Sequence, residues 1–502
     1  MASIRAPFQE WTGESKIMVG VDIGTTQSGV AFVFLERGCK PTIHRVIRWP
    51  GLEVDRAAAK IPTLVWYDNN KKAVSFGAEA LQPQVEEQAE DNALPFGVSL
   101  RQIYSDYVGY LLKHTQAYFE DRIIDGRKTW DCYKPTLEVV MAHPPGWGIR
   151  ERFFLRTAVV DTGFVNHYNA SRRVKFVTEA EASAHFCIWH SNLGSQLQPG
   201  TNFAVCDAGG STVDTTLYSV VSTSPLLRLQ EQRPSACIQA GAIFVDFEAE
   251  KYLRKTLASA ELSPYDIGEY TNAGVKDFES VAKRLFRDPN ETTRYSIIIA
   301  HASFTNASIN TCCGGMSLSG AVIKSFFDGC TTQIMHSVDQ QIEGLVVPHI
   351  LLVGGFGDSE YLKSEFKKRY ESQGCQITLI NDSTSKAVAD GAIMWAVANT
   401  VFSCARFSYG MQTSIRFDPP SPDHQGRHVI IDPSGYGIIP GRWFQLIAKG
   451  VPLEMDSVIR QSFSLTYTTP NSRPGNFTLD LFSYSGSDEP MWMRDEQGTL
   501  LI

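Results

Sequence analysis

The sequence contains two related strand–turn–strand segments, and this repetition constrains the fold more than any other feature. The first, VGVDIGTTQSGVAF, covers 19–32, and the second, VCDAGGSTVD, covers 205–214. In each, an apolar run of strand-forming residues reaches an aspartate, turns at glycine and returns as a second strand. The two copies lie about 185 positions apart, which is typical of a duplicated lobe and not of a short-period solenoid. The sequence therefore predicts an internally duplicated fold.

Alternating strands and helices are predicted for the rest of the chain up to about residue 400. A Pro-Pro break ends the first of these strands, and glycines mark the ends of several elements. The predicted elements are a strand within 136–147, a helix ending at Gly163, a strand and helix over 174–190, a helix over 319–343, a strand over 349–353 and a helix over 386–398. This alternation is typical of an α/β protein.

The length of 502 residues exceeds what one hydrophobic core organises, so several domains are expected. We expect a disordered N-terminal segment over 1–16 and a first lobe over 17–200 with a return segment at about 381–404. A second lobe is expected over 201–380. After residue 405 the sequence becomes rich in proline, glycine and serine and then alternates in short segments, which predicts a small, mainly β C-terminal module over 405–502.

Composition and charge exclude some classes of function. The net charge of −8 and the lack of a lysine- and arginine-rich run argue against nucleic-acid binding. No stretch reaches the roughly 18 apolar residues that cross a bilayer, and residues 1–16 lack the apolar core of a signal peptide. The ten cysteines are scattered without metal-ligand spacing, as expected of reduced thiols in the cytoplasm.

The glycine turns carry the chemistry that a polyphosphate requires. Glycine lets backbone amides converge without a Cβ in the way, and Thr25, Thr26, Ser211 and Thr212 add hydroxyl donors. Asp22 and Asp207 would repel a bare phosphate, but each could hold a hydrated Mg²⁺ against one. The alternative for any single turn is an ordinary β-hairpin. The Walker lysine loop is absent from the sequence.

Five segments in fixed order resemble the heat shock protein 70 (DnaK-like) family, in its divergent fungal branch. They are GVDIGTTQSGVAF, VTEAEASAHF, CDAGGSTVD, LLVGGFGDSEYL and KAVADGA, which span residues 17–400. The family belongs to the actin-like ATPase superfamily, together with actin and sugar kinases. The resemblance implies a duplicated actin-like ATPase fold, with ATP or ADP and Mg²⁺ in a cleft between two lobes.

The resemblance also implies roles for individual residues. Asp22 and Asp207 would hold Mg²⁺ through water, and Glu179 would position the attacking water; the alternative for Glu179 is a carboxylate favoured by a helix N-terminus. The residues implied to contact the phosphates are Gly24, Thr25, Thr26, Gly209, Gly210, Ser211, Thr212 and Gly241. The residues implied to contact adenosine are Gly354, Gly355, Glu279 and Lys283, although an exposed amphipathic helix also explains the last two.

Two departures from the family pattern concern catalysis. Ser211 replaces a glycine of the phosphate cradle, and the family's first-lobe lysine is missing, because the sequence has no lysine between Lys72 and Lys113. Arg101 lies nearby in the sequence. Loss of such a cation slows phosphoryl transfer more than it weakens binding, so nucleotide binding is a stronger prediction than hydrolysis.

Three functions remain open on the sequence alone. The first is a chaperone ATPase whose C-terminal module, interpreted as a reduced substrate-binding domain, docks unfolded peptides and responds to co-chaperones. The second is a nucleotide-binding switch, or pseudoATPase, that presents a surface to partners with little hydrolysis. The third is a small-molecule kinase of the same superfamily, which would need an aspartate base beside a substrate hydroxyl.

Overall fold

The computed structural model describes residues 10–52, 58–81, 97–191, 193–223, 227–379, 387–398, 401–404, 407–449, 451–454, 460–464, 479–486 and 488–494. Most of the segment expected to be disordered, residues 1–9, lies outside these ranges. The remainder is tied to the body of the protein, because the Trp11 amide donates to the Cys39 carbonyl at 2.9 Å and the Gly38 amide to the Trp11 carbonyl at 2.8 Å. The described chain divides into two compact units, residues 1–227 with 235–399, and residues 228–234 with 400–502.

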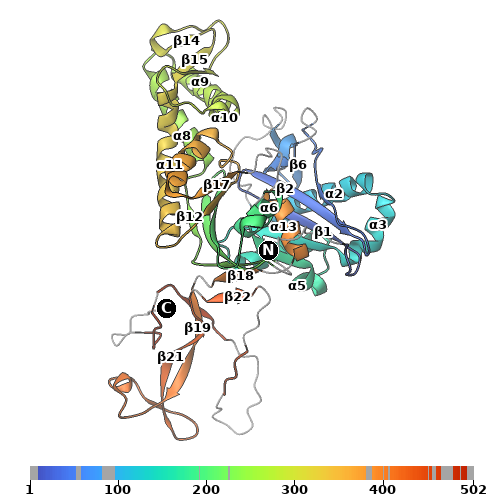
Figure 1. The fold of residues 1–502 in the computed structure, drawn as a ribbon, viewed down its shortest axis with the longest axis vertical. Helices are drawn as coiled ribbons and strands as arrows, with labels where there is room; N and C mark the ends of the chain where they lie inside the picture. The colour runs from blue at the N-terminus through green and yellow to red at the C-terminus, as the bar shows by residue number, and fades with distance from the viewer. Residues whose placement is uncertain are drawn as a thin grey trace. The chain divides into compact units, whose positions relative to one another are not determined.

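The first unit is built around two sheets (Figure 1). One has the order β3-β2-β1-β7-β8, with β4 also paired to β2. Its strands are β1 (Lys16–Ile23), β2 (Gln27–Leu35), β3 (Ile43–Arg45), β4 (Lys60–Pro62), β7 (Glu138–His143) and β8 (Val174–Thr178). The strands β1 and β7 are buried over most of their length, as expected of a sheet covered on both faces.

The second sheet of this unit repeats the first. Its strands run in the order β12-β10-β9-β16-β17 and are β9 (Asn202–Ala208), β10 (Val213–Ser222), β12 (Ala236–Ile238), β16 (His349–Val353) and β17 (Gln376–Leu379). In both sheets a central hairpin is antiparallel and the next two strands are parallel to its first strand. The predicted duplication is confirmed, and the fold is a duplicated actin-like ATPase fold.

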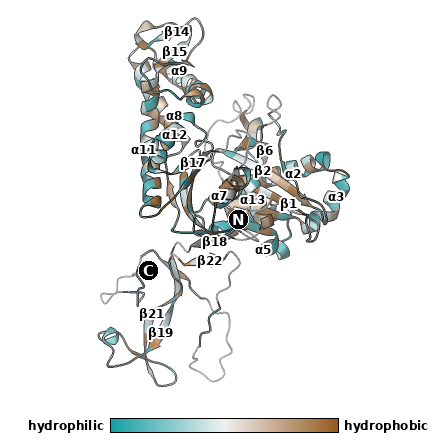
Figure 2. Ribbon diagram, viewed as in Figure 1, coloured by the Kyte–Doolittle hydropathy of each residue, from teal (hydrophilic) through white to brown (hydrophobic). Residues whose placement is uncertain are grey.

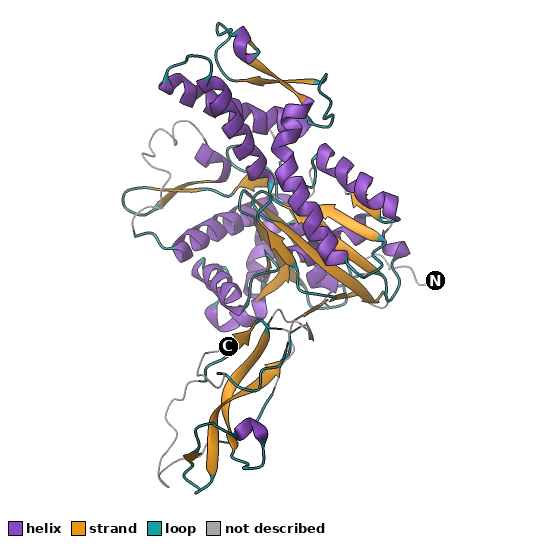
Figure 3. Ribbon diagram, turned by 90° about the vertical axis from the view of Figure 1, so that its left-hand side faces the viewer, coloured by secondary structure: helices purple, strands orange, loops and turns teal. Residues whose placement is uncertain are grey.

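Helices flank both sheets (Figure 3). They are α2 (Leu100–Arg122), α3 (Gly126–Tyr133), α4 (Ile149–Asp161), α5 (Ala170–Arg173), α6 (Glu179–His190), α7 (Leu193–Gln196), α8 (Ala242–Ala258), α9 (Pro264–Asp277), α10 (Lys283–Leu285), α11 (Gly320–Ile342), α12 (Glu360–Tyr370) and α13 (Ala387–Ala398). Two small sheets complete the unit, β5 (Val65–Tyr67) with β6 (Ala73–Phe76), and β13 (Arg294–Ile298), β15 (Gly315–Ser319) and β14 (Thr311–Cys312). The predicted strands and helices of this region are confirmed.

Each lobe has its own hydrophobic core. One core gathers around β1, β2, β7 and α2, and the other around β9, α8, α11 and β16. Figure 2 shows the consequence, since β1 and β2 are brown while much of α3 and α11 is teal. None of the helices in the described ranges is long and apolar enough to cross a membrane.

The helices α6 and α13 follow the last strand of each sheet and cross each other closely. A Cβ added to Gly391 of α13 would overlap the Ala182 carbonyl of α6, and one added to Gly20 of β1 would lie 2.6 Å from the Ala389 carbonyl oxygen. Backbone therefore meets backbone at these points, which only glycine permits.

The second unit contains only β-strands and one short 3₁₀ turn among its described residues. Its longer strands, β19 (Ser408–Arg416) and β21 (Gly437–Ile447), form an antiparallel pair flanked by β23 (Phe482–Tyr484) and β20 (Ile430–Ile431). A second set comprises β11 (Arg228–Glu231), β18 (Val401–Cys404) and β22 (Pro452–Glu454). This unit differs from the expected module in two ways. It includes β18, which lies within the expected return segment, and it includes β11, which lies within the expected second lobe.

Candidate functional site

The first glycine turn joins β1 to β2 and places Asp22 at its entrance. The Gly24 amide closes the turn on the Gln27 carbonyl at 3.2 Å, and Asp22 lies opposite Gly29 in the hairpin register. Asp22 is buried, whereas Thr25 and Thr26 are exposed. The carboxylate thus lies at the base of a turn whose hydroxyl groups remain accessible.

The second glycine turn joins β9 to β10 with the same construction. The Gly209 amide donates to the Thr212 carbonyl at 3.0 Å, and Asp207 lies opposite Asp214. Both aspartates are buried. The sequence analysis did not single out Asp214, although its place at the end of the CDAGGSTVD motif could have marked it as an acid of the site.

The two turns contact each other. A Cβ added to Gly210 would lie 2.6 Å from both Oγ1 and Cγ2 of Thr26. The threonine of the first turn therefore rests against the bare Cα of the second. Segments that lie far apart in the sequence meet here because each forms the same bend in one of the two repeated sheets.

The acidic side chains around the turns act on one another electrostatically. Burial and the charges of Asp22, Asp207 and Asp214 raise the pKa of Glu179 well above its ordinary value. Burial, Asp214 and Asp22 raise the pKa of Asp207 to about 7, against an opposing effect of Lys60. Glu179 begins α6, where the helix dipole alone would lower its pKa. Burial among like charges therefore outweighs the helix terminus in the environment of Glu179.

This set of acids fits a hydrated cation. Within the described ranges, no group of three or more His, Cys, Asp or Glu side chains is arranged to hold a metal ion directly. Carboxylates that raise each other's pKa nevertheless favour a nearby positive charge. Mg²⁺ takes oxygen ligands and keeps several waters, so it suits carboxylates that are close but do not share a compact shell.

The N-terminus of α8 is hydrogen-bonded to the second glycine turn. The amides of Gly241, Ala242 and Ile243 donate to the carbonyls of Ser211, Gly209 and Gly210 at 3.0, 3.1 and 2.9 Å. A Cβ added to Gly241 would lie 2.5 Å from the Gly210 carbonyl group. Gly241 is therefore brought to the turn, but its amide is already used by the protein.

The third glycine turn packs on the end of β9. Gly354 has φ +86°, and a Cβ there would overlap the Ala208 carbonyl oxygen and Oδ1 of Asp207. The Phe356 amide donates to the same Ala208 carbonyl at 2.8 Å. Gly355 is exposed, with open space around its Cα. The structure thus brings Gly354 against the carboxylate of Asp207 and leaves Gly355 accessible.

Glu279 lies in a π-helical turn, Phe278–Ala282, and Lys283 follows directly after it. The Lys283 ammonium donates to both oxygens of Asp246 on α8, at 2.6 and 2.8 Å, and lies 3.4 Å from the Ala242 carbonyl oxygen. Burial raises the pKa of Asp246 to about 6 against the opposing charge of Lys283. Glu279 is exposed. Lys283 is therefore near the second turn through α8, but it is paired within the protein.

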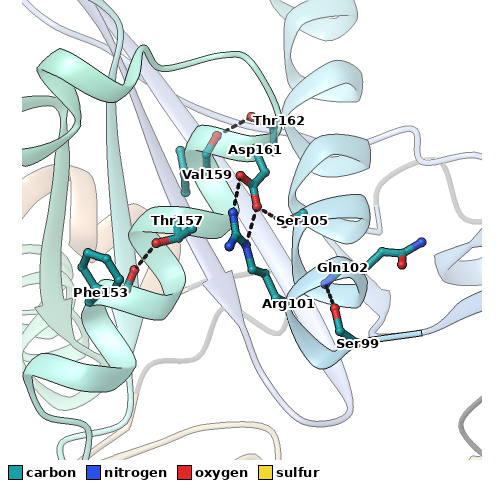
Figure 4. Close-up of polar contacts among 9 residues, drawn as sticks. All are labelled: Ser99, Arg101, Gln102, Ser105, Phe153, Thr157, Val159, Asp161 and Thr162. Atoms are coloured by element: carbon teal, nitrogen blue, oxygen red, sulfur yellow. Dashed lines mark hydrogen bonds and ion pairs between the residues drawn. The ribbon is translucent and has the colours of Figure 1, made fainter. Parts of the chain in front are cut away.

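Arg101 does not replace the missing lysine. Its guanidinium makes a bidentate pair with Asp161 of α4, at 2.7 and 2.8 Å, and Ser105 also donates to that carboxylate at 3.3 Å (Figure 4). This pair fastens α2 to α4 at an exposed position. The positive charge of Arg101 is thus engaged by Asp161.

Lys60 is a residue of the site that the sequence analysis missed. It begins the three-residue strand β4, and its charge acts on both Glu179 and Asp207. The family pattern predicts a lysine in the segment after Lys72, but the sequence has none there before Lys113. The KIP segment carries no strong strand signal of its own, and only its pairing with β2 brings Lys60 to the acids.

No family model matches the chain. The chain is similar to heat shock 70 kDa protein 12A of Homo sapiens, with 20% identity over 498 aligned residues that cover 80% of this chain and 72% of the human protein. The same protein of Mus musculus gives the same identity and coverage. Heat shock 70 kDa protein 12B of Homo sapiens is 20% identical over 526 aligned residues, covering 85% of this chain and 74% of that protein. The resemblance to heat shock protein 70 proteins thus extends over most of the chain.

Proposed function

We propose that the chain is a heat shock protein 70-like protein that binds Mg²⁺-ATP where its two glycine turns meet. The observation that carries this proposal is the contact of Thr26 with Gly210, with Asp22, Asp207 and Glu179 acting on one another around it. The similarity to the heat shock 70 kDa proteins supports it. Assignment to the fungal branch rests only on the motifs and is part of the proposal.

Each turn would serve the nucleotide in a different way. The amides and hydroxyls of residues 24–26 and 209–212 would donate to phosphate oxygens, and Asp22 and Asp207 would hold Mg²⁺ through its water ligands. Bound Mg²⁺ would supply the positive charge that the phosphates and carboxylates need. Gly355 would leave room for adenosine, and Lys283 would have to leave Asp246 to contact it.

Glu179 would position the water that attacks the terminal phosphate. Its raised pKa makes the carboxyl a better proton acceptor when it is ionised, which suits a group that orients or deprotonates water. Glu179→Ala is therefore expected to slow any ATP turnover while sparing ATP affinity. Equal losses of turnover and affinity in single-turnover and binding assays would contradict this role.

Thermal unfolding with and without Mg²⁺-ATP tests the binding site. A ligand at a hundred times its Kd stabilises the folded state by about 2.7 kcal/mol, so the melting temperature should rise. Asp207→Ala should weaken the dependence of this rise on Mg²⁺ concentration. A melting temperature that does not respond to nucleotide would contradict the proposal.

Two outcomes of binding are distinguished by hydrolysis. We propose a chaperone ATPase that couples nucleotide binding to the C-terminal unit, with unfolded peptides and co-chaperones as partners in the cytoplasm. The engagement of Arg101 by Asp161 favours the second candidate, a switch with little hydrolysis, because the charge of Arg101 is used within the protein and does not stand in for the lost lysine. Single-turnover hydrolysis separates them: an unfolded peptide should accelerate phosphate release from a chaperone, whereas a switch should retain unhydrolysed ATP.

A further inference from the structure

Lys60 and Asp22 lie on the same face of the first sheet with a glycine between them. In the register of the hairpin Asp22 pairs with Gly29, and in the pairing of β2 with β4 the same Gly29 pairs with Lys60. Directly opposite residues of adjacent strands point to the same face of a sheet. Because Gly29 has no side chain, the stem of Lys60 can pass over β2 toward Asp22.

The charge of Lys60 reaches acids of both lobes. Burial and neighbouring aspartates raise the pKa of Glu179 in the first lobe and of Asp207 in the second, and Lys60 opposes both changes. Burial also raises the pKa of Asp358, in the loop after β16, and Lys363 and Lys60 oppose that change. The ammonium therefore lies within range of acids from both lobes.

Lys60 forms no ion pair with any residue that the structure describes. Across the ranges that the structure describes, no salt bridge of 4.0 Å or less involves Lys60, whereas Arg101 is paired with Asp161 and Lys283 with Asp246. Lys60 is also partly exposed. The three ammonium donors of Lys60 therefore remain available for another anion.

Hydrogen bonds hold β4 in place beside the first turn. The Tyr107 hydroxyl of α2 donates to the Pro62 carbonyl at 2.9 Å. The Thr63 amide donates to the Thr26 carbonyl at 3.0 Å, and the Thr63 hydroxyl donates to the Gly24 carbonyl at 2.8 Å. The backbone that carries Lys60 is thus fixed to the turn that would contact the phosphates.

We propose that Lys60 donates to the terminal phosphate of the bound nucleotide and makes the site prefer ATP to ADP. This inference rests on the proposed function. Lys60 is assigned to the terminal phosphate because it lies across Gly29 from Asp22, and because Thr63 next to β4 is hydrogen-bonded to Gly24 and Thr26 of the turn that would contact the phosphates. The ammonium keeps its proton and supplies positive charge to the bound terminal phosphate.

Affinities of the full chain for Mg²⁺-ATP and Mg²⁺-ADP, measured by calorimetry, test this inference. Loss of one charge-assisted contact weakens binding by about 10- to 100-fold, so Lys60→Gln should lose this much affinity for ATP and less than about threefold for ADP. Lys60→Arg, which keeps the charge, should retain most of the preference. Lys72→Gln is the matched control, because Lys72 is exposed near the same lobe's β5–β6 hairpin and should leave both affinities unchanged.

The outcomes separate this inference from the proposed function. Equal losses for ATP and ADP in Lys60→Gln, or no loss for either, would overturn the role of Lys60 while leaving nucleotide binding intact. Failure of the unaltered protein to bind either nucleotide would overturn both. If Lys60→Gln does not fold, as judged by circular dichroism, Lys60→Met and Lys60→Arg provide the comparison, and an unchanged ATP preference in Lys60→Met would overturn the inference.

Discussion

The buried imidazole of His185 predicts an acid-sensitive stability. His185 lies in α6 beneath the site, and burial lowers its pKa from 6.5 to about 4. The unfolded chain takes up this proton first, so the stabilisation is fully present above pH 6.5 and is lost as the pH falls from 6.5 to about 4. At about 1.4 kcal/mol per pKa unit, the loss is on the order of 3 kcal/mol. Urea unfolding across this range should show the decline, and His185→Leu should reduce it.

The control for this prediction is His301→Gln, because His301 is exposed in the second lobe. Its unfolding free energy should follow that of the unaltered protein across the same range. A decline of equal size in His185→Leu would show that other groups cause the acid sensitivity.

The contact between the two glycine turns predicts a measurable coupling between residues of the two lobes. Gly210→Ala would place a Cβ 2.6 Å from the side chain of Thr26, and overpacking of this kind costs about 1–3 kcal/mol. Gly210 is not among the glycines with positive φ, so the clash is the main penalty. Thr26→Ala in the same chain should recover part of the loss in denaturant unfolding. Strictly additive effects would show that the turns do not touch.

At the scale of residues, the sequence indicates the acids of the candidate site but not its cation. Asp22 and Asp207 stand next to glycine turns, where their type and spacing indicate metal and phosphate chemistry. The sequence does not indicate Lys60 and Asp214 as residues of the site, because their positions in it depend on pairing between strands. Lys60 reaches Asp22 only through the register of β4 on β2, and no local pattern encodes that register.

At the scale of elements, the crossing of α6 and α13 predicts a strong dependence on one glycine. Gly391→Ala would push a Cβ into the Ala182 carbonyl, which cannot move without displacing α6. We expect a loss of at least 1–3 kcal/mol in the free energy of unfolding. Gly329→Ala in α11 is the matched control, since nothing lies within 4 Å of an added Cβ, and it should be stabilising by about 0.5–1 kcal/mol. Similar effects of both changes would contradict the close crossing.

Most elements of the first unit could be predicted because their sequence signals are local. The helix expected over 319–343 is α11, and Ser319 caps it by accepting from the Val322 amide. The helix expected to end at Gly163 ends at Asp161, and Gly163 has φ +76°. The strand pairing could not be predicted in the same way, because β3, β4 and β12 are only three residues long and owe their conformation to their neighbours.

At the scale of the whole molecule, the chain passes from one unit to the other three times. It leaves the first unit after residue 227, returns at 235 and leaves again after 399. The strand β11 of the second unit is thus flanked in the sequence by β10 and β12, and β10 carries Asp214. The passage of the chain between the two units could not be predicted, because the composition of the sequence changes only near residue 405.

This connectivity predicts which backbone amides outside the first unit respond to nucleotide binding. If closure is coupled to the second unit, Mg²⁺-ATP should slow hydrogen exchange of amides in β11 as well as in the glycine turns. Exchange measured by mass spectrometry on the full chain, with and without Mg²⁺-ATP, checks this. Protection confined to the turns would favour the switch over the coupled chaperone.

The two repeated sheets carry different residues at equivalent positions, so the two halves of the first unit are not chemically symmetric. Two halves with the same strand order offer equivalent positions to whatever lies between them, yet a nucleotide has a different chemical group at each end. Equivalent positions have diverged accordingly: the residue opposite the leading aspartate is Gly29 in one half and Asp214 in the other. One half thus gains room for a lysine, and the other gains a second acid.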